Sequence, residues 1–425
     1  MHNLIISFTV LQNLIQEGCE IMSRFKKSAI GFICLGMLFV NSIGIVAYAK
    51  EENDVTSDNI FDVTEFGATI DDESDDGLAI QSAFDECNAA DGGTVYFPAG
   101  VYNVSKTIFF YSNQNILFED GAVMKRVANS ENVKDTCGVF LCNWFDVENT
   151  NSETSSVACR NVVISGGMFD GGGATPTESP CPVAMINTCH ADNVVIENCK
   201  FINNYNAHCI EINSSDNVTI SNCEFDDYYG TTSQVRYNEI IQIDKSVNAA
   251  LGTYFDGASY RTLRGYNSAT YIDYVSPDCK GCSNIIIKDC DFISNAYCSA
   301  IGNHHESPYS TTNSIIQIFN NTFSGGTSSR GYIVFDCHTT DIEIFDNKFY
   351  GGECGVTVNA DSAECNVYNN EFYSCKVISK GDVTAYDNYI EDVKEEKKTG
   401  FELILETIKE FFNNILNFIM TLFGM

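Results

Sequence analysis

The chain is organised around a nine-residue unit in which apolar residues at the second, fourth and ninth places alternate with polar ones. One copy, Asn193 to Phe201, reads Asn-Val-Val-Ile-Glu-Asn-Cys-Lys-Phe. An alternation of period two is typical of a β-strand rather than of a helix. Other copies span residues 161–169, 217–225, 284–292, 315–323, 341–349 and 364–372, with a degenerate copy at 382–390. The pattern predicts a β repeat.

The spacing of the copies predicts a solenoid. The phenylalanines that close them are mostly separated by roughly 20 to 30 residues, which is the range of solenoid coils. A unit this short cannot bury its own apolar face, so the copies must stack into a parallel β-helix with one continuous core. Only the interval from Phe225 to Phe292 is long enough for an additional coil with a loop.

The seventh place of the unit predicts side-chain ladders along the axis. It holds cysteine in three copies and asparagine in four later ones, because it reads Cys199, Cys223, Cys290, Asn321, Asn347, Asn370 and Asn388. Equivalent residues on stacked coils lie one above the other, so we expect one run of thiols and one of hydrogen-bonded amides.

Three motifs precede the repeats. Residues 61–67 form a strand pattern, 75–84 a helix with an acidic start, and 92–102 a strand with a Pro-Gly turn. Leu78, Ala79, Ala83 and Phe84 give that helix an apolar stripe with which to plug the open end of a solenoid.

The same three motifs closely resemble the start of pectin-lyase-like right-handed β-helix proteins, a superfamily that includes polygalacturonases, pectate lyases and phage tailspikes. The resemblance covers about residues 60 to 390. It implies an all-β, single-stranded right-handed parallel β-helix with an N-terminal capping helix, and a polysaccharide lying across one outer sheet. The motif at 92–102 is specific for the fold and not for a reaction.

The ends of the chain predict export. Arg24 to Lys27, the apolar run 28–46 and the small-residue exit 47–49 have the three parts of a secretory signal peptide, with Met22 as a possible true start. An uncleaved membrane anchor is the alternative. The expected organisation is a leader at 1–49, a linker at 50–60, the β-helix at 61–392, a charged linker at 393–400 and an amphipathic helix at 401–425. We therefore expect a secreted protein, with possible cell-surface association.

The C-terminal segment has a broad apolar face at helical spacing, formed by Phe401, Leu405, Ile408, Phe412, Ile415 and Ile419. Two interpretations stay open. The helix caps or lies along the β-helix, or it contacts a membrane surface or a partner.

Net charge narrows the expected binding partners, and the cysteine content bears on disulfides and metal sites. The formal net charge of −33 makes nucleic acid an unexpected partner, and disfavours a polyanionic substrate unless the site is locally basic or a cation bridges the two. Nineteen cysteines in an exported chain suggest disulfides, although a thiol in the core ladder behaves as a small apolar group. Cys279 and Cys282 have zinc-knuckle spacing without a second pair, so a loop disulfide or free thiols are expected there.

Four central coils carry a further strand that presents polar residues, at 208–213, 239–244, 297–305 and 332–338. Aligning them on the apolar residues Ile212, Ile243, Ile301 and Phe335 places their neighbours on the outer face. One outward column is then Glu211, Gln242, Ala300 and Val334. The next is Asn213, Asp244, Gly302 and Asp336.

These columns place carboxylates around a gap floored by Gly302 and Ala300. From strand geometry, the backbones of Glu211 and Asp244 are expected about 8 Å apart, and those of Asp244 and Asp336 about 10 Å apart. Such a separation suits an inverting glycoside hydrolase, in which one carboxyl protonates the leaving oxygen and another activates water. The alternative is that these outward polar residues are simply solvated.

Histidines and arginines gather on the same coils. Four of the six histidines lie there: His208, His304, His305 and His338. Arg236, Arg261 and Arg264 lie in or beside the insertion 245–280, and Arg330 precedes the fourth strand. The arginines suggest a clamp for a uronate, and His304 or His208 a proton partner. A loop packed by its own aromatic residues is the alternative for the insertion.

The catalytic motifs of the polygalacturonases are not retained. Their Asn-Thr-Asp, Asp-Asp and Gly-His-Gly align with residues 206–208, 238–239 and 296–298, and near their Arg-Ile-Lys only Arg330 remains. The candidate catalytic residues are therefore different ones: Glu211, Glu239, Asp244, Asp336, His208 and His304. The candidate substrate-binding residues are Gln242, His305, Arg236, Arg261, Arg264, Arg330 and His338.

The sequence thus predicts a secreted glycoside hydrolase, distantly related to the polygalacturonases, that acts on a pectic or other plant-type polysaccharide without a cofactor. A calcium-dependent polysaccharide lyase is one alternative, with Asp244, Asp336 and Arg330 in its site. A non-catalytic glycan-binding or adhesive β-helix is the other, since a fold does not fix a function.

Overall fold

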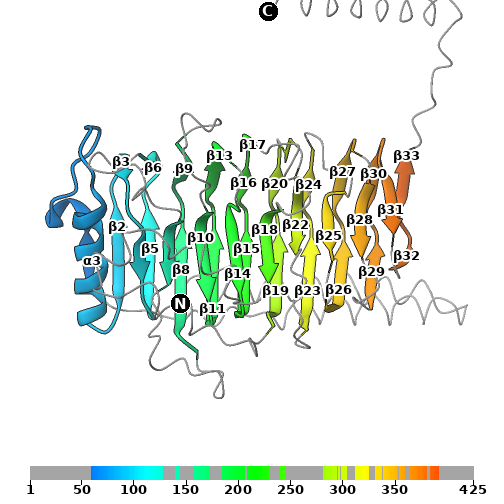
Figure 1. Ribbon diagram of the computed structural model, residues 1–425, viewed down its shortest axis with the longest axis horizontal. Helices are drawn as coiled ribbons and strands as arrows, with labels where there is room; N and C mark the ends of the chain where they lie inside the picture. The colour runs from blue at the N-terminus through cyan, green and yellow to red at the C-terminus, as the bar shows by residue number, and fades with distance from the viewer. Residues whose placement is uncertain are drawn as a thin grey trace, which may run out of the picture. The chain divides into compact units, whose positions relative to one another are not determined.

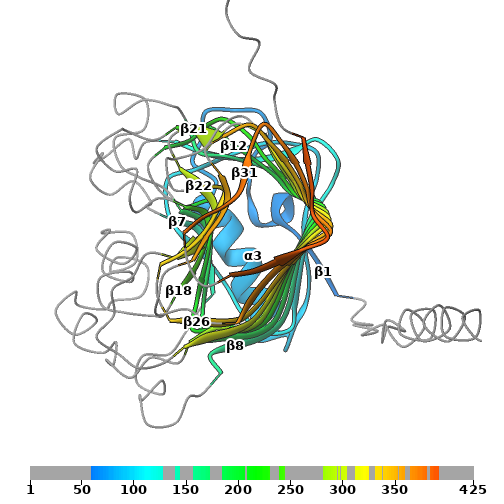
Figure 2. The ribbon, with the colours of Figure 1, turned by 90° about the vertical axis from the view of Figure 1, so that its right-hand side faces the viewer.

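The chain forms a right-handed parallel β-helix, as the repeats and the resemblance predict. The computed structural model describes residues 59–127, 139–143, 157–172, 184–205, 208–229, 239–244, 281–293, 295–296, 298–303, 312–324, 331–336, 338–352, 354–358, 364–380 and 383–391. Figure 1 shows the strands side by side along the axis, and Figure 2 shows the sheets enclosing the core. Every strand pairs in parallel with its neighbours of the adjacent coils.

Three long sheets and one short sheet build the walls. Sheet A has eleven strands: β1 (Ile60–Asp62), β2 (Gly93–Phe97), β5 (Gln114–Phe118), β8 (Cys159–Ser165), β11 (Ala191–Glu197), β15 (Asp216–Ser221), β19 (Ser283–Lys288), β23 (Asn313–Phe319), β26 (Thr339–Phe345), β29 (Cys365–Tyr368) and β32 (Val383–Tyr386). Sheet B has ten: β3 (Gly100–Val104), β6 (Ala122–Arg126), β9 (Met168–Asp170), β12 (Lys200–Ile202), β16 (Glu224–Phe225), β20 (Asp291–Phe292), β24 (Thr322–Phe323), β27 (Lys348–Tyr350), β30 (Glu371–Tyr373) and β33 (Tyr389–Glu391).

Sheet C has nine strands: β4 (Ile108–Phe110), β7 (Val139–Asn143), β10 (Ala184–Cys189), β14 (Ile210–Asn213), β18 (Glu239–Asp244), β22 (Ser299–Asn303), β25 (Ile333–Phe335), β28 (Cys354–Val358) and β31 (Lys376–Lys380). Sheet D has three: β13 (Asn204–Tyr205), β17 (Tyr228–Tyr229) and β21 (Asn295–Ala296). A complete central coil runs through sheets A, B, D and C in that order.

The nine-residue unit contains two strands and a corner. In the copy at 193–201, β11 ends at Glu197, the chain turns at Asn198, and β12 begins at Lys200. Asn198 has a φ of 59°, a left-handed conformation that asparagine and aspartate adopt more readily than other non-glycine residues. The equivalent sixth places also have positive φ: Asn222, Asp289, Asn320, Asp346 and Asn369. The unit therefore passes from sheet A to sheet B.

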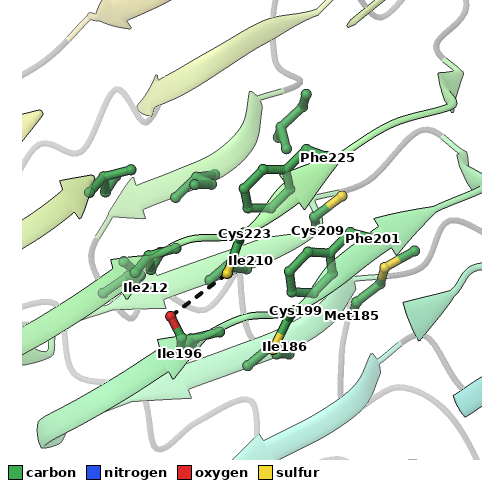
Figure 3. Close-up of a cluster of buried hydrophobic side chains, with 14 of the residues drawn as sticks. Met185, Ile186, Ile196, Cys199, Phe201, Cys209, Ile210, Ile212, Cys223 and Phe225 are labelled. Atoms are coloured by element: carbon green, nitrogen blue, oxygen red, sulfur yellow. Dashed lines mark hydrogen bonds between the residues drawn. The ribbon is translucent and has the colours of Figure 1, made fainter. Parts of the chain in front are cut away.

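The phenylalanines at the ninth place form a continuous stack inside the solenoid. The ring centroids of Phe201 and Phe225 lie 4.9 Å apart, and the planes of the two rings are nearly parallel, at 4° (Figure 3). This spacing matches that of neighbouring strands, so each ring packs on its equivalent one coil away. Phe225 stacks directly on Phe292 at 4.8 Å. The interval between these two residues therefore contains no additional coil, although its length allowed one.

The predicted amide ladder is confirmed. The side chain of Asn347 accepts hydrogen bonds from the backbone N–H and the side-chain amide of Asn321, at 2.9 and 3.0 Å. Its own amide group donates to Asn370 Oδ1 at 3.0 Å, and Asn370 repeats the pattern with Asn388. Each corner of the later coils is thus tied to the next by side-chain hydrogen bonds.

The cysteines act as core residues. All thirteen cysteines in the described part of the chain are buried, and none of them forms a disulfide. The ladder thiols donate to backbone carbonyl groups, as Cys290 Sγ does to Lys288 O at 3.1 Å. Cys282 donates to Asp244 O at 3.1 Å, while Cys279 lies outside the described residues. For the described cysteines the expected disulfides are therefore wrong, because their side chains point into apolar packing.

A helix closes the N-terminal end, as expected. The 3-10 turn η1 (Val63–Phe66) leads to α3 (Gly77–Ala89), which lies across the first coils in Figures 1 and 2. Ile80, Ala83 and Phe84 of α3 are fully buried against the core. Leu78, which we expected in the apolar stripe, is exposed because it lies on the other side of the helix.

Several expected segments lie outside the described residues. They are the leader at 1–49, most of the linker at 50–60, the linker at 393–400 and the helix at 401–425, and these boundaries stay predictions. No helix among the described residues is long and apolar enough to span a membrane.

Candidate functional site

Sheet C differs from sheets A and B in how its side chains are buried. In sheets A and B, buried residues alternate with partly exposed ones along the strands. In β14 and β18 every residue is buried, on both faces of the sheet. The same holds for β10, β22 and β28. The outer face of these strands of sheet C is therefore shielded from solvent, which argues against the alternative that its polar side chains are simply solvated.

Strand alternation places a row of polar groups on this outer face. Ile210 and Ile212 of β14 belong to the core shown in Figure 3, so Glu211 between them projects from the opposite face. The outward row that contains Glu211 reads Asn187, Glu211, Gln242, Gly302 and Val334. A second row, two residues along, has Asn213 beside Asp244. The predicted pairings of Glu211 with Gln242 and of Asn213 with Asp244 are confirmed.

The expected pairing of β22 with β18 is wrong by two residues. We expected Ile301 beside Ile243, but Ile301 pairs with Ile241. Gly302 consequently lies beside Gln242 in the row of Glu211, and Ala300 belongs to the core. The expected gap between Asp244 and Asp336, floored by Gly302 and Ala300, is therefore wrong.

A buried asparagine explains the difference. Asn303 pairs with Phe335 and fills the inward place that we assigned to Ile301. Its side-chain amide donates to Thr339 Oγ1 at 2.8 Å, and its Oδ1 accepts from the backbone N–H of Asp336 at 2.9 Å. Because these bonds satisfy the amide, a polar residue can occupy a core position, and an alignment on apolar residues misses it.

Gly302 allows close approach of two strands. A Cβ atom at this position would lie 1.9 Å from the backbone oxygen of Val334, which is well inside the contact distance of the two atoms. The row of outward side chains is therefore interrupted after Gln242 by a residue that cannot be replaced without moving the backbone.

Glu211 is a buried carboxyl with a raised pKa. Its side chain is 1% exposed, and Asn187 Nδ2 donates to its Oε2 at a long 3.4 Å. Burial raises the pKa of Glu211 well above its ordinary value because the charged form loses its hydration; a hydrogen bond from Asn213 lowers this pKa, and the charges of Asp244 and Glu239 raise it. The net direction favours the protonated acid, which can donate a proton.

Asp244 lies diagonally across from Glu211. The two strands are adjacent and the two residues are offset by two places, so their backbones lie about 8 Å apart. Gln242 Nε2 donates to Asp244 Oδ2 at 3.3 Å. Asp244 is also 1% exposed, so the pair lies in surroundings where charge interactions are stronger than in water.

Glu239 and His208 lie at the start of the same wall. Both are buried, and His208 Nδ1 is 2.6 Å from the backbone oxygen of Glu239, which makes Nδ1 the protonated nitrogen. Glu239 pairs with Ser299 on β22, three residues before the row of Glu211. These two residues are therefore on the predicted wall but not beside Asp244.

Two of the remaining predicted residues, Asp336 and His338, are described by the structure. Asp336 follows the end of β25 and is partly exposed. His338 lies at the corner that leads into β26, where its backbone oxygen accepts from Asn313 N at 2.8 Å. The other six predicted residues lie outside the described part of the chain: His304, His305, Arg236, Arg261, Arg264 and Arg330.

Two amides of this wall were not among the predicted site residues: Asn187, which the alignment did not include, and Asn213, which it placed in the second column. Both are fully buried; Asn213 interacts with the Glu211 carboxyl, whereas Asn187 Oδ1 has no hydrogen-bond partner among the described residues. Buried polar groups are nearly always paired, so such atoms indicate a place where a ligand or water binds. The alternation in the strand at 184–189 carries the signal for Asn187, but our alignment began one coil later.

The described residues contain no group of three or more His, Cys, Asp or Glu side chains that could hold a metal ion. The described groups of this wall are two carboxyls and two amides, which suit a substrate that carries hydroxyl groups.

Comparison with known proteins agrees with this architecture. Residues 60–226 match the family model described as rhamnogalacturonase A/epimerase, pectate lyase-like. Over 317 residues the chain is 27% identical to plasmin and fibronectin-binding protein A of Streptococcus pneumoniae, which covers 69% of this chain and 39% of that protein. The chain thus spans about two fifths of the length of that relative.

Two solved structures share the fold. PfbA, a surface adhesin of Streptococcus pneumoniae, superposes with a TM-score of 0.62 and 21% identity, over 80% of each chain. A hyperthermoactive exopolygalacturonase from Thermotoga maritima gives a TM-score of 0.51 and 14% identity, over 78% of this chain and 79% of that one. One of these proteins is an adhesin and the other is an enzyme.

Proposed function

We propose that the chain, which has a pectin-lyase-like parallel β-helix fold and matches a pectate lyase-like family model over residues 60–226, is an extracellular glycoside hydrolase that cleaves a polysaccharide at the outer wall of sheet C. The observation that carries this proposal is the placement of two buried carboxyls diagonally across adjacent strands of one wall. Burial raises the pKa of Glu211, which suits a general acid, and Asp244, which accepts a hydrogen bond from Gln242, is the carboxyl that we assign as the base.

The reaction follows from that assignment. Glu211 donates its proton to the glycosidic oxygen as the bond from this oxygen to the anomeric carbon breaks. A water molecule attacks the anomeric carbon from the opposite face and gives a proton to Asp244. With backbones about 8 Å apart, the two carboxyl groups can lie on opposite sides of a sugar ring with a water between one of them and the ring, which is the arrangement of an inverting mechanism.

The two amides supply substrate contacts. Asn187 lies beside Glu211 in the same row, and Asn213 lies beside Asp244. An amide group can both donate to and accept from a sugar hydroxyl, and binding would satisfy Asn187 Oδ1, which is buried without a partner among the described residues. The predicted arginines, histidines and Asp336 remain candidates for further contacts.

The test is a screen of the purified chain on pectic and neutral polysaccharides, with and without calcium. New reducing ends without unsaturated products indicate hydrolysis. Glu211→Gln and Asp244→Asn should each lower turnover by about 10²- to 10⁴-fold, the usual contribution of an acid or base. Asp291→Asn, at an exposed position of sheet B, is the matched control and should leave turnover unchanged.

Other outcomes would overturn the proposal in defined ways. Unsaturated products that require calcium mean a polysaccharide lyase. Full activity of Asp244→Asn in a correctly folded protein places the site elsewhere. Circular dichroism and melting of each variant exclude unfolding as the cause of a loss.

A second candidate function is adhesion, which the similarity to plasmin and fibronectin-binding protein A over 317 residues favours. In this case the chain binds a glycan or host protein at the cell surface without turnover. Retention on immobilised polysaccharide or fibronectin, with no new reducing ends in any substrate, would support it. The extracellular or cell-surface location is part of both proposals.

A further inference from the structure

The two ends of the β-helix differ in how the core is closed. At the N-terminal end, Ile80 and Phe84 of α3 are fully buried on the first coil. Gln81 also satisfies the edge of β4, because its Nε2 donates to Phe109 O at 3.1 Å and its Oε1 accepts from Phe109 N at 2.7 Å. Both the apolar core and a strand edge are therefore covered there by one amphipathic helix.

At the C-terminal end, the inward side chains of the last described coil are uncovered. Ile390 on β33 pairs with Phe372 on β30 and so occupies the next place of the phenylalanine stack. Phe372 is 0% exposed, whereas Ile390 is 51% exposed. Ala385, the neighbour of the buried Val367, is likewise exposed. The core thus ends in apolar side chains on which no described residue packs.

Two outer rows of aromatic rings end on the same coil. On sheet A a stack runs through Phe319, Phe345, Tyr368 and Tyr386. On sheet B Tyr350 stacks on Tyr373, and Tyr389 contacts Tyr373 with its ring tilted by 57°. Their last rings, Tyr386 and Tyr389, are 46% and 55% exposed. Together with Val383, Ala385 and Ile390, these two tyrosines form what we name the C-terminal rim.

The strands of this coil are also sheet edges. β31, β32 and β33 each stand at the end of their sheet in the described part of the chain. A sheet edge presents backbone groups that pair with another chain unless a helix or loop covers it. An apolar end face with three such edges requires a cover, as terminal coils of solenoids generally do.

We propose that the chain's own segment 401–423 binds the C-terminal rim as a second capping helix. The apolar face of this segment repeats at helical spacing and includes Phe412 and Ile415. This is the counterpart of the way in which α3 covers the N-terminal end. The interpretation of the segment as a cap is thereby preferred over a membrane or partner contact.

The short link between β33 and the apolar segment favours this segment as the cover of the C-terminal rim. β33 ends at Glu391, within the rim, and only residues 392–400 separate it from the apolar segment. Nine residues reach at most about 30 Å when fully extended. A short link of this kind holds the segment at an effective concentration of order millimolar, which a second copy of the chain does not reach in dilute solution.

A sugar is a poorer occupant of the rim than an apolar helix. Tyr350 and Tyr373 stack at 4.9 Å and 5°, so the faces of rings inside a stack are covered by their neighbours. A sugar ring packs on an aromatic face, and these stacks present mostly ring edges along the walls. The exposed groups of the rim are aliphatic side chains and the last aromatic rings of the outer rows, and such groups suit the apolar face of a helix.

The test uses hydrogen–deuterium exchange of the full chain, read on peptides that cover residues 383–391. The rim amides should be protected in the wild type. Phe412→Asp combined with Ile415→Asp should accelerate their exchange at least tenfold and increase binding of a hydrophobic dye. Ile390→Asp should have the same effect from the other side, while Asn413→Asp, on the polar face of the segment, should change neither readout.

Three results would overturn the proposal. The first is free exchange of the rim amides in the wild type. The second is protection that falls on dilution together with a dimer in light scattering, which identifies a second copy as the cover. The third is protection that persists in both apolar-face variants while these variants remain folded by circular dichroism.

Discussion

Replacing Asn347 by alanine tests whether the amide ladder holds the later coils together. The side chain of Asn347 donates to Ile318 O, Phe345 O and Asn370 Oδ1, and accepts twice from Asn321. Phe345 O, Asn370 Oδ1 and the Asn321 amide keep other described partners. The backbone N–H of Asn321 loses its partner, and Ile318 O loses a side-chain donor.

The magnitude follows from these losses. Leaving the buried Asn321 N–H without a partner costs about 1–3 kcal/mol and losing the bond to Ile318 O about 0.5–1.5 kcal/mol, so the two losses together give about 3 kcal/mol of lost unfolding free energy. With an unfolding entropy of about 2.1 cal/mol/K per residue over roughly 330 residues, this corresponds to a melting temperature lower by about 4 °C. Differential scanning calorimetry measures both the shift and any loss of cooperativity.

Two further variants make the test specific. Asn347→Cys restores the residue type that earlier coils use at this place, where Cys290 Sγ donates to Lys288 O, and should recover part of the loss. Asn366→Ala removes a surface bond from Asn366 Nδ2 to Glu343 Oε1 and should cost less than about 1 kcal/mol. The amide ladder does not hold the later coils together if Asn347→Ala melts at the wild-type temperature, or if Asn366→Ala lowers the melting temperature by as much as Asn347→Ala.

Two predictions concern titratable groups. Because the pKa of Glu211 is raised in the folded state, the folded chain holds this proton more tightly than the unfolded chain does. The stabilisation from the bound proton is complete below the pKa of Glu211 in the unfolded chain, about 4.3, and is lost as the pH rises through the pKa in the folded chain. Glu211→Gln should therefore gain in melting temperature relative to the wild type between pH 5 and pH 8, and a constant difference across this range would contradict the raised pKa. Burial also raises the pKa of the core thiols, to about 12 for Cys209 and Cys159, and keeps them from reagents. The thirteen described cysteines should stay unlabelled by a thiol reagent in the native chain and react after denaturation, as mapped by peptide mass spectrometry; labelling before unfolding would show that these thiols are accessible.

The sequence alone determined the solenoid. A period-two pattern that repeats every coil leaves one solution for burying its apolar face, which is to stack, and residues that recur at one place must then form ladders. The stack through Phe201 and Phe225 and the amide bonds of Asn347 follow directly from this reasoning. The pairing of Glu211 with Gln242 was also accessible, because strand alternation fixes the face and the apolar neighbours fix the register.

Only the tertiary structure decided the features that depend on what lies across from a residue. Asn303 shifted the register of one coil because its hydrogen bonds to Thr339 and Asp336 let a polar side chain point inward, and hydropathy does not record this satisfaction. The burial of Glu211 and Asp244 likewise depends on what covers the outer face of sheet C, which the local pattern does not encode. Periodicity is a property of neighbouring residues, whereas burial and pKa are set by contacts between distant ones, so the rod could be inferred from the chain and the chemistry of its wall could not.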